Sequence, residues 1–162
     1  MSQELKRRGT RARVWRYLPL ALWMSLIFFA STGELSASNT SLIVRPLLLW
    51  LFPDISEARI ALAHFLVRKA AHFTEYAILA FLAARAFRGS FHEWLRRRWF
   101  IISLLLIILY ALSDEFHQSF VPSRTASIYD SMIDIAGGLT ALLKYKWEVG
   151  RRKDESVAIQ PE

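Results

Sequence analysis

The sequence predicts an all-α, polytopic helical membrane protein with about four transmembrane helices and both termini in the cytoplasm. Three observations support this fold class. Hydrophobic residues make up 54% of the 162 residues, which is high for a soluble domain. The apolar residues gather in four long runs. The basic residues gather in the segments between and beyond these runs, as they do in membrane proteins.

The four apolar runs are the candidate spans, because a membrane helix needs about 20 residues, with about 17 as a lower limit. They are Tyr17–Thr32, Ala70–Phe87, Trp99–Leu112 with an extension to Phe120, and Ile128–Trp147. The third run is almost unbroken, whereas Asp130 and Asp134 interrupt the fourth. Together the runs predict about four transmembrane helices.

The distribution of basic residues predicts the orientation. Sixteen of the 21 Lys and Arg residues lie in the N-terminal tail, in the loop after the second run, or at the C-terminal end. Loops rich in Lys and Arg stay in the cytoplasm, so we expect a multi-pass protein of the cytoplasmic (inner) membrane. The alternative for the first run is a signal peptide with small residues at Ser36-Ala37-Ser38. Its cleavage would leave the orientation of the other spans unchanged.

The chain divides into one membrane domain and two tails. Residues 1–16 form a basic cytoplasmic tail, residues 17–147 form the membrane domain, and residues 148–162 form a cytoplasmic tail. We expect this second tail to be disordered from Arg152 onward.

The segment between the first two spans is not a plain linker. Leu42–Phe52 is apolar but too short to span, so we expect it in or near the outer interface. Asp54 and Glu57 have the spacing of a capping box, and no Gly or Pro follows before Gly89. The sequence therefore predicts one continuous helix of about 50 Å that includes the second span.

Composition limits the classes of partner and chemistry. The net charge of +7 would also suit a nucleic-acid-binding protein, but such proteins do not usually carry several long apolar runs, so no nucleic-acid partner is expected. The chain has no Cys, which excludes disulfides, thiol catalysis and thiolate metal sites. No paired metal-ligand spacing is visible, and we predict no metal and no cofactor. Membrane lipids are the expected partners, and protein partners are left open.

Polar residues from four stretches should meet at the outer side of the membrane. Each stretch lies where a predicted span enters or leaves on that side: Glu34, Lys69–Tyr76, Asp114–Gln118, and Asp130 with Asp134. Helical spacing puts Lys69, His72 and Tyr76 on one face. The same spacing puts Asp114, His117 and Gln118 on one face. Ionisable groups in membrane helices are costly, so their grouping at one depth favours a functional site.

Each of these residues also has a structural interpretation. His72 can be a buried hydrogen-bonding histidine, and Asp114 or Glu115 can pair with a base only to hold helices together. Asp130 can cap its helix. Asp134 lies too deep for a cap, so its structural interpretation is an ion pair inside the bundle. Gly137 and Gly138 are small residues, and we expect them to allow close packing of the fourth span against its neighbours.

The polar group permits more than one chemistry. Lys69 and Arg124 could hold the phosphate or carboxylate of an amphiphile whose tail stays in lipid. His72 or His117 beside a carboxylate could act as an acid–base catalyst. No nucleophile motif accompanies them, so whether the chain is an enzyme stays open.

The arrangement of these residues is similar to that of a known family. The pattern Lys69-x-x-His72-Phe73-x-x-Tyr76, then Asp114-Glu115-x-x-Gln118-x-Phe120-x-Pro122-x-Arg124-x-x-Ser127-x-x-Asp130, then Gly137, resembles the VanZ-like family. The resemblance covers residues 69–142. Two positions depart from it, since Arg68 stands where an acidic residue is expected and Asp134 stands where asparagine is expected.

The resemblance implies a small multi-pass membrane protein of a family whose namesake is associated with teicoplanin resistance. It implies that ligand-binding positions are Lys69, His72, Tyr76, Glu115, Gln118, Arg124 and Asp130. The favoured hypothesis is an outward-facing polar pocket that binds or handles a cell-envelope amphiphile or lipoglycopeptide, with a contribution to glycopeptide resistance. One alternative is a structural or assembly protein whose polar cluster only clamps helices. The other is a membrane enzyme that acts on a lipid-linked phosphate or glycan.

Overall fold

A computed structural model describes residues 2–31, 37–120 and 127–158 of the chain. All regular structure in these residues is helical, as predicted, and no strand occurs among them. The helices are α1 (Ser2–Ser31), α2 (Ala37–Leu51), α3 (Glu57–Arg88), α4 (Glu93–Arg97), α5 (Trp99–Gln118) and α6 (Ile128–Ala158).

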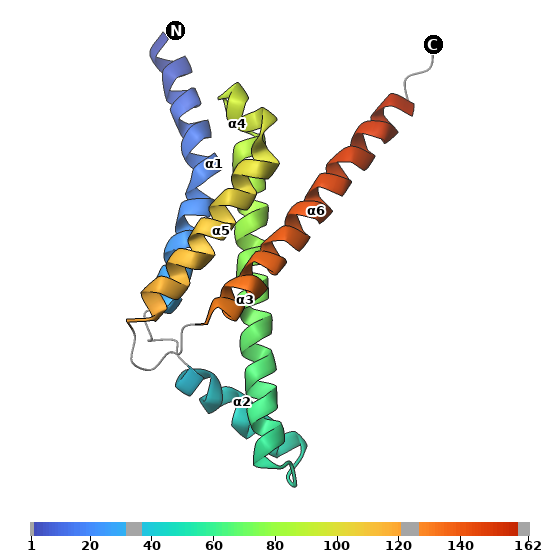
Figure 1. Cartoon of the computed structure of the whole chain (residues 1–162). Coiled ribbons are helices and arrows are strands. Elements are labelled where there is room, and N and C mark those ends of the chain that lie inside the picture. Colours follow the sequence, from blue (N-terminus) through green and yellow to red (C-terminus); the bar gives the residue numbers. More distant parts are fainter. Residues whose placement is uncertain (1, 32–36, 121–126, 159–162) are drawn as a thin grey trace.

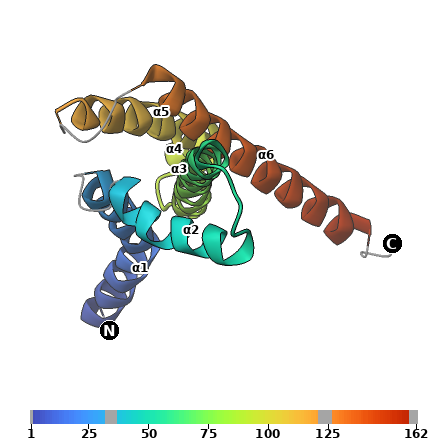
Figure 2. The ribbon, with the colours of Figure 1, turned by 90° about the horizontal axis from the view of Figure 1, so that it is seen from below.

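Helix α3 is the centre of the molecule and contacts every other helix. Seen along α3, the helices α1, α5 and α6 lie on different sides of it, and α2 crosses its near end (Figure 2). Helices α3 and α6 run in the same direction, and α1 and α5 run in the opposite direction (Figure 1).

The two ends of the bundle differ in what they contain. The N-terminus, α4 and the C-terminus lie at one end, called the terminal end below (Figure 1). Helices α1 and α5 finish at the other end, where α6 begins, and this is called the cluster end. The three basic segments of the sequence therefore share the terminal end, and α2 with the first turns of α3 projects past the cluster end.

Within residues 2–31, 37–120 and 127–158, two helical segments are long and apolar enough to cross a membrane, Val14–Ser31 and Trp99–Gln118. They correspond to the first and third predicted spans. The other two predicted spans lie in α3 and α6, where His72, Glu75 and Asp134 lower the hydropathy of the apolar runs. Along α5, large apolar side chains such as Leu105, Leu109 and Phe116 are exposed on one face, as expected of a helix that faces lipid.

Several predicted boundaries can be compared with the structure. The long helix is confirmed, because α3 continues through 32 residues without a break, a length of about 48 Å. The apolar segment 42–52 falls mostly within α2, which contains Pro46. The prediction of a disordered tail from Arg152 is wrong over most of its length, because α6 continues to Ala158. An Arg151–Glu155 ion pair of 3.6 Å, one turn apart, supports this extension.

Close packing in the bundle depends on small residues. A Cβ atom at Gly137 would lie 2.2 Å from the backbone oxygen of Phe73 in α3. A Cβ atom at Gly138 would lie 2.8 Å from the Ile107 side chain in α5. Helix α6 can therefore approach both neighbours only because it has glycine at these two positions, which confirms the predicted packing role.

Candidate functional site

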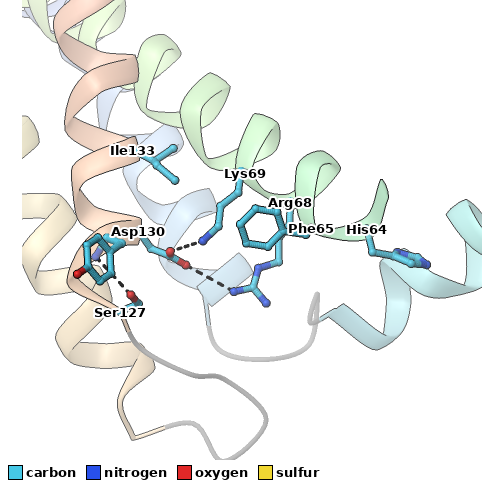
Figure 3. A pocket seen from close by; sticks show the side chains of 8 residues that line it. His64, Phe65, Arg68, Lys69, Ser127, Asp130 and Ile133 are labelled. Atoms are coloured by element: carbon cyan, nitrogen blue, oxygen red, sulfur yellow. Dashed lines mark hydrogen bonds and ion pairs between the residues drawn. The ribbon is translucent and has the colours of Figure 1, made fainter. Parts of the chain in front are cut away.

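Two basic residues of α3 share one carboxylate of α6 at the cluster end. Lys69 Nζ donates to Asp130 Oδ1, and Arg68 Nη2 lies 3.5 Å from Asp130 Oδ2 (Figure 3). Asp130 is buried, whereas Arg68 and Lys69 are partly exposed. The group carries two positive charges for one negative charge, so it can still attract an anion.

The next pair lies one helical turn deeper. His72 Nδ1 is 3.2 Å from Asp134 Oδ1, and both side chains are buried. The order of the two pairs follows from geometry. Lys69 and His72 are three residues apart on α3, and Asp130 and Asp134 are four residues apart on α6. Because the two helices run in the same direction, the pairs stack along their interface.

A third set of contacts joins α3 to α5 and α1. Tyr76 Oη donates to Asp114 Oδ2 over 3.4 Å. Gln118 Nε2 donates to the same oxygen over 3.1 Å and lies 3.5 Å from Ser31 Oγ at the end of α1. Tyr76 is fully buried and Gln118 nearly so. The aligned donors explain how Asp114 is accommodated inside the bundle without a basic partner among these residues.

Glu115 fixes the beginning of α6 against α5. Its Oε2 atom accepts a hydrogen bond of 2.8 Å from the backbone N–H of Ser127. The backbone N–H of Asp130 in turn donates to the carbonyl of Ser127 over 2.8 Å. The Glu115 side chain therefore satisfies one of the free N–H groups at this helix start and holds Asp130 in register with α3.

The contacts described so far form one polar cluster between α3, α5 and α6. Three buried polar atoms in or beside this cluster have no hydrogen-bond partner within the described parts of the chain. They are Glu115 Oε1, Ser131 Oγ and Asp134 Oδ2. Buried polar atoms nearly always have a partner, so each such atom needs an explanation. No group of three or more His, Asp or Glu side chains in residues 2–31, 37–120 and 127–158 is placed to hold a metal ion.

A pocket of about 580 Å³ opens next to the Lys69–Asp130 pair. Figure 3 shows its polar side chains from α3 and the start of α6. Its lining combines charged and apolar groups: His64, Phe65, Arg68, Lys69, Ser127, Tyr129, Asp130 and Ile133. Phe65 and Tyr129 are themselves exposed, so apolar surface continues outward from the charged group. Such a pocket can receive an anionic group that is attached to an apolar chain.

The structure brings most of the predicted site residues together. Six of them lie in the cluster, namely Lys69, His72, Tyr76, Glu115, Gln118 and Asp130. Only Lys69 and Asp130 of these also line the pocket. Arg124 and Glu34 lie outside the described residues. His117, the second catalytic candidate, packs its ring against Phe28 of α1 at a centroid distance of 4.7 Å.

Four residues of the site were not among the predicted binding positions. Asp114 and Asp134 accept the central contacts of the cluster, and Arg68 and His64 line the pocket. Helical spacing contains a signal for three of them. Asp134 lies one turn after Asp130, Asp114 lies one turn before Gln118, and His64 lies one turn before Arg68.

The model of the VanZ/LLP1 family matches residues 16–148, which is most of the chain. No curated protein and no solved structure matches. The match includes every residue of the polar cluster and the pocket, and it confirms the resemblance that the sequence motifs indicate.

Proposed function

The chain belongs to the VanZ/LLP1 family, and from this premise we propose that it is a multi-pass inner-membrane protein that binds the anionic head of a cell-envelope amphiphile. In this proposal α1, α3, α5 and α6 are the four spans. The terminal end lies in the cytoplasm, because the basic segments gather there. The cluster end then faces outward, with α2 beyond it.

The observation that carries the proposal is the sharing of Asp130 by Arg68 and Lys69 at the pocket. The Asp130 carboxylate compensates only one of the two positive charges, and the phosphate or carboxylate of a ligand can pair with the other. Phe65, Tyr129 and Ile133 supply apolar walls for the first carbons of the attached chain. The exposed apolar side chains outside the pocket allow the rest of the chain to stay in lipid.

The chemical class of the ligand follows from this lining. It is an amphiphile with a single anionic head, such as a phospholipid, a lipid-linked cell-wall precursor or a lipoglycopeptide. Handling of such molecules at the outer face would be the route by which this chain contributes to glycopeptide resistance. An antibiotic-sensitivity assay with and without the gene tests that last step separately.

The binding step is tested by the thermal stability of the purified protein with short-chain phosphatidylglycerol. A ligand that binds only the folded state raises the midpoint, by an amount that grows with the ratio of its concentration to Kd. We expect a rise for the wild type and a much smaller rise for Arg68→Gln. This variant keeps the Lys69–Asp130 pair, so the buried carboxylate stays compensated.

The matched control is Arg97→Gln, an exposed arginine of α4 at the terminal end that pairs with Glu93. It should respond to the lipid as the wild type does. Phosphatidylcholine of the same chain length should give no comparable rise. An equal rise in Arg68→Gln and the wild type would contradict the proposed site.

A second function is favoured by the deeper contacts. Tyr76, Asp114 and Gln118 are buried away from the pocket and connect α1, α3 and α5. These residues fit a clamp that holds the helices together. If the whole cluster is a clamp, substitutions at Arg68 and Lys69 lower thermal stability. In that case the wild type itself shows no rise in midpoint with the lipid.

A further inference from the structure

The described part of the polar cluster contains more acidic than basic groups. Four buried carboxyl side chains meet there: Asp114, Glu115, Asp130 and Asp134. The basic side chains paired with them are Arg68 and Lys69, which both contact Asp130, and His72, which contacts Asp134 and is charged only if protonated. Uncompensated charge inside a membrane bundle is costly, and protonation is the usual way to remove it. The charge balance therefore favours the uptake of a proton when further negative charge enters the cluster.

The His72–Asp134 pair is the place in the cluster best built to hold that proton. Its two atoms are 3.2 Å apart. A neutral His72 can already donate its one ring N–H to Asp134, and one added proton would turn the pair into an imidazolium next to a carboxylate. Asp134 is 0% exposed, and its Oδ2 atom has no hydrogen-bond partner among the described residues. By contrast, Asp114 accepts two neutral donors, and Glu115 accepts a backbone N–H.

The pair lies next to the charged group of the pocket. Lys69 is three residues before His72 on α3, and Asp130 is four residues before Asp134 on α6, so the two pairs are one helical turn apart. Charges this close interact strongly inside a helical bundle. The titratable and charged groups around the pair are Lys69, Glu75 and Tyr76 from α3, Asp114 and Glu115 from α5, and Asp130 from α6. A change in the charge balance at Asp130 therefore changes the electrostatic potential at Asp134, one turn away.

We propose that the His72–Asp134 pair is a proton-binding site coupled to the pocket, so that binding of an anionic head takes up a proton. An anion that engages Arg68 and Lys69 draws their charge away from Asp130. The negative charge left on Asp130 then favours addition of one proton from the aqueous phase to the neighbouring pair. This inference rests on the proposed function, since it describes what happens when that pocket is filled.

The sign of the pH dependence follows from linkage. If binding takes up a proton, a higher proton concentration favours the bound state, so affinity rises as pH falls. One proton gives up to about a tenfold change in affinity per pH unit. Phosphatidylglycerol is a suitable probe, because its phosphodiester keeps one negative charge over the range of a pH titration near neutrality.

The experiment is calorimetric titration of the full-length protein in detergent with dioctanoyl phosphatidylglycerol. It is carried out at one pH in two buffers that differ in ionisation enthalpy, which gives the number of protons taken up. We expect about one proton per lipid for the wild type near the titration of the pair. Asp134→Asn should bring this number close to zero and remove the pH dependence of the affinity.

His72→Gln removes the other half of the pair and carries the same expectation where Asp134→Asn folds poorly. Glu57→Gln is the control, because it removes an exposed carboxylate of α3 that pairs with Arg45. It should keep the proton uptake of the wild type. Lipid binding without proton uptake in the wild type, or uptake unchanged in both pair variants, overturns the inference and leaves the proposed function standing.

Two further outcomes are decisive. If phosphatidylglycerol does not bind at all, both the proposed function and the inference fail. If the affinity follows the sodium concentration at constant pH and no proton is taken up, the pair is not a proton site and the inference fails alone.

Discussion

The half of α3 that carries Lys69, His72 and Tyr76 packs through polar pairs, whereas the half from Leu79 to Ala86 packs through small apolar side chains. In the second half Leu79 and four alanines are fully buried: Ala80, Ala83, Ala84 and Ala86. They contribute to a core with Ile107, Ala111 and Leu142. One helix thus meets the same neighbours, α5 and α6, in two chemically different ways.

The difference shows which half is shaped by more than packing. Small apolar residues let membrane helices approach closely without desolvating a polar group. A buried ion pair adds little net stability, although its loss leaves a costly unpaired charge. The net contribution of the polar pairs to stability is therefore expected to be small. The ligand and proton binding proposed above would account for a polar half of this kind.

The largest effect should come from the closest backbone contact between α3 and α6, which lies within the polar half. Gly137→Val would place a side chain against the Phe73 backbone, which its Cβ would approach to 2.2 Å. Backbone cannot move aside as a flexible side chain can, so α3 and α6 must separate and both halves should be lost. We expect little or no monodisperse protein after purification, measured by yield and size-exclusion chromatography.

Gly150→Val is the matched control for this prediction. A Cβ at Gly150 meets nothing within 4 Å, and valine is a better helix former than glycine by a few tenths of a kcal/mol. This variant should accumulate like the wild type. A stable Gly137→Val protein would show that α3 and α6 are not held together as described.

An intermediate effect is expected from breaking one polar pair. Asp134→Leu leaves His72 buried without its partner and should lower the free energy of unfolding by about 3 kcal/mol. The double variant His72→Leu with Asp134→Leu removes both groups and should recover most of that loss. Reversible unfolding in mixed micelles measures both values.

The apolar half supplies the contrast for this pair. Ile107→Ala creates a cavity and should cost about 2–4 kcal/mol, with no second substitution at His72 able to restore it. Failure of the double variant to recover stability would mean that the polar pair, like the apolar core, is needed for folding itself.

Much of the fold and part of the site follow from local sequence rules. The end of α3 follows from Gly89, whereas α3 begins at Glu57 after Ser56, two residues later than the capping-box spacing of Asp54 and Glu57 predicts. Helical spacing puts Lys69 and His72 on one face of α3. The distribution of basic residues gives the orientation of each predicted span, and this puts Asp130 at the same end of the bundle. Such rules work because a helix fixes which residues share a face, whatever the helix packs against.

The remaining features depend on contacts that spacing does not specify. Asp114 and His117 are three residues apart, yet Asp114 faces Tyr76 and His117 faces Phe28. Which of them enters the cluster depends on where α1 lies against α5. The polar residues that form the cluster also lower the hydropathy of α3 and α6, and among the described residues two helical segments are long and apolar enough to cross a membrane. The helical C-terminal extension has no apolar face that would have predicted it.

The smallest effect is expected from the hydrogen bond between Tyr76 and Asp114. A double-mutant cycle with Tyr76→Phe and Asp114→Asn should give a coupling energy of about 0.6 kcal/mol, as is usual for side-chain hydrogen bonds between membrane helices. The same cycle with Tyr17→Phe and Ser90→Ala is the control, because that bond joins α1 to the segment after α3 at the terminal end. Its 2.9 Å length, against 3.4 Å for Tyr76 and Asp114, predicts a coupling at least as large. A coupling above about 2 kcal/mol at Tyr76 would exceed what membrane hydrogen bonds usually contribute. In that case the polar half would stabilise the fold in its own right, and a ligand would no longer be needed to explain why it is retained.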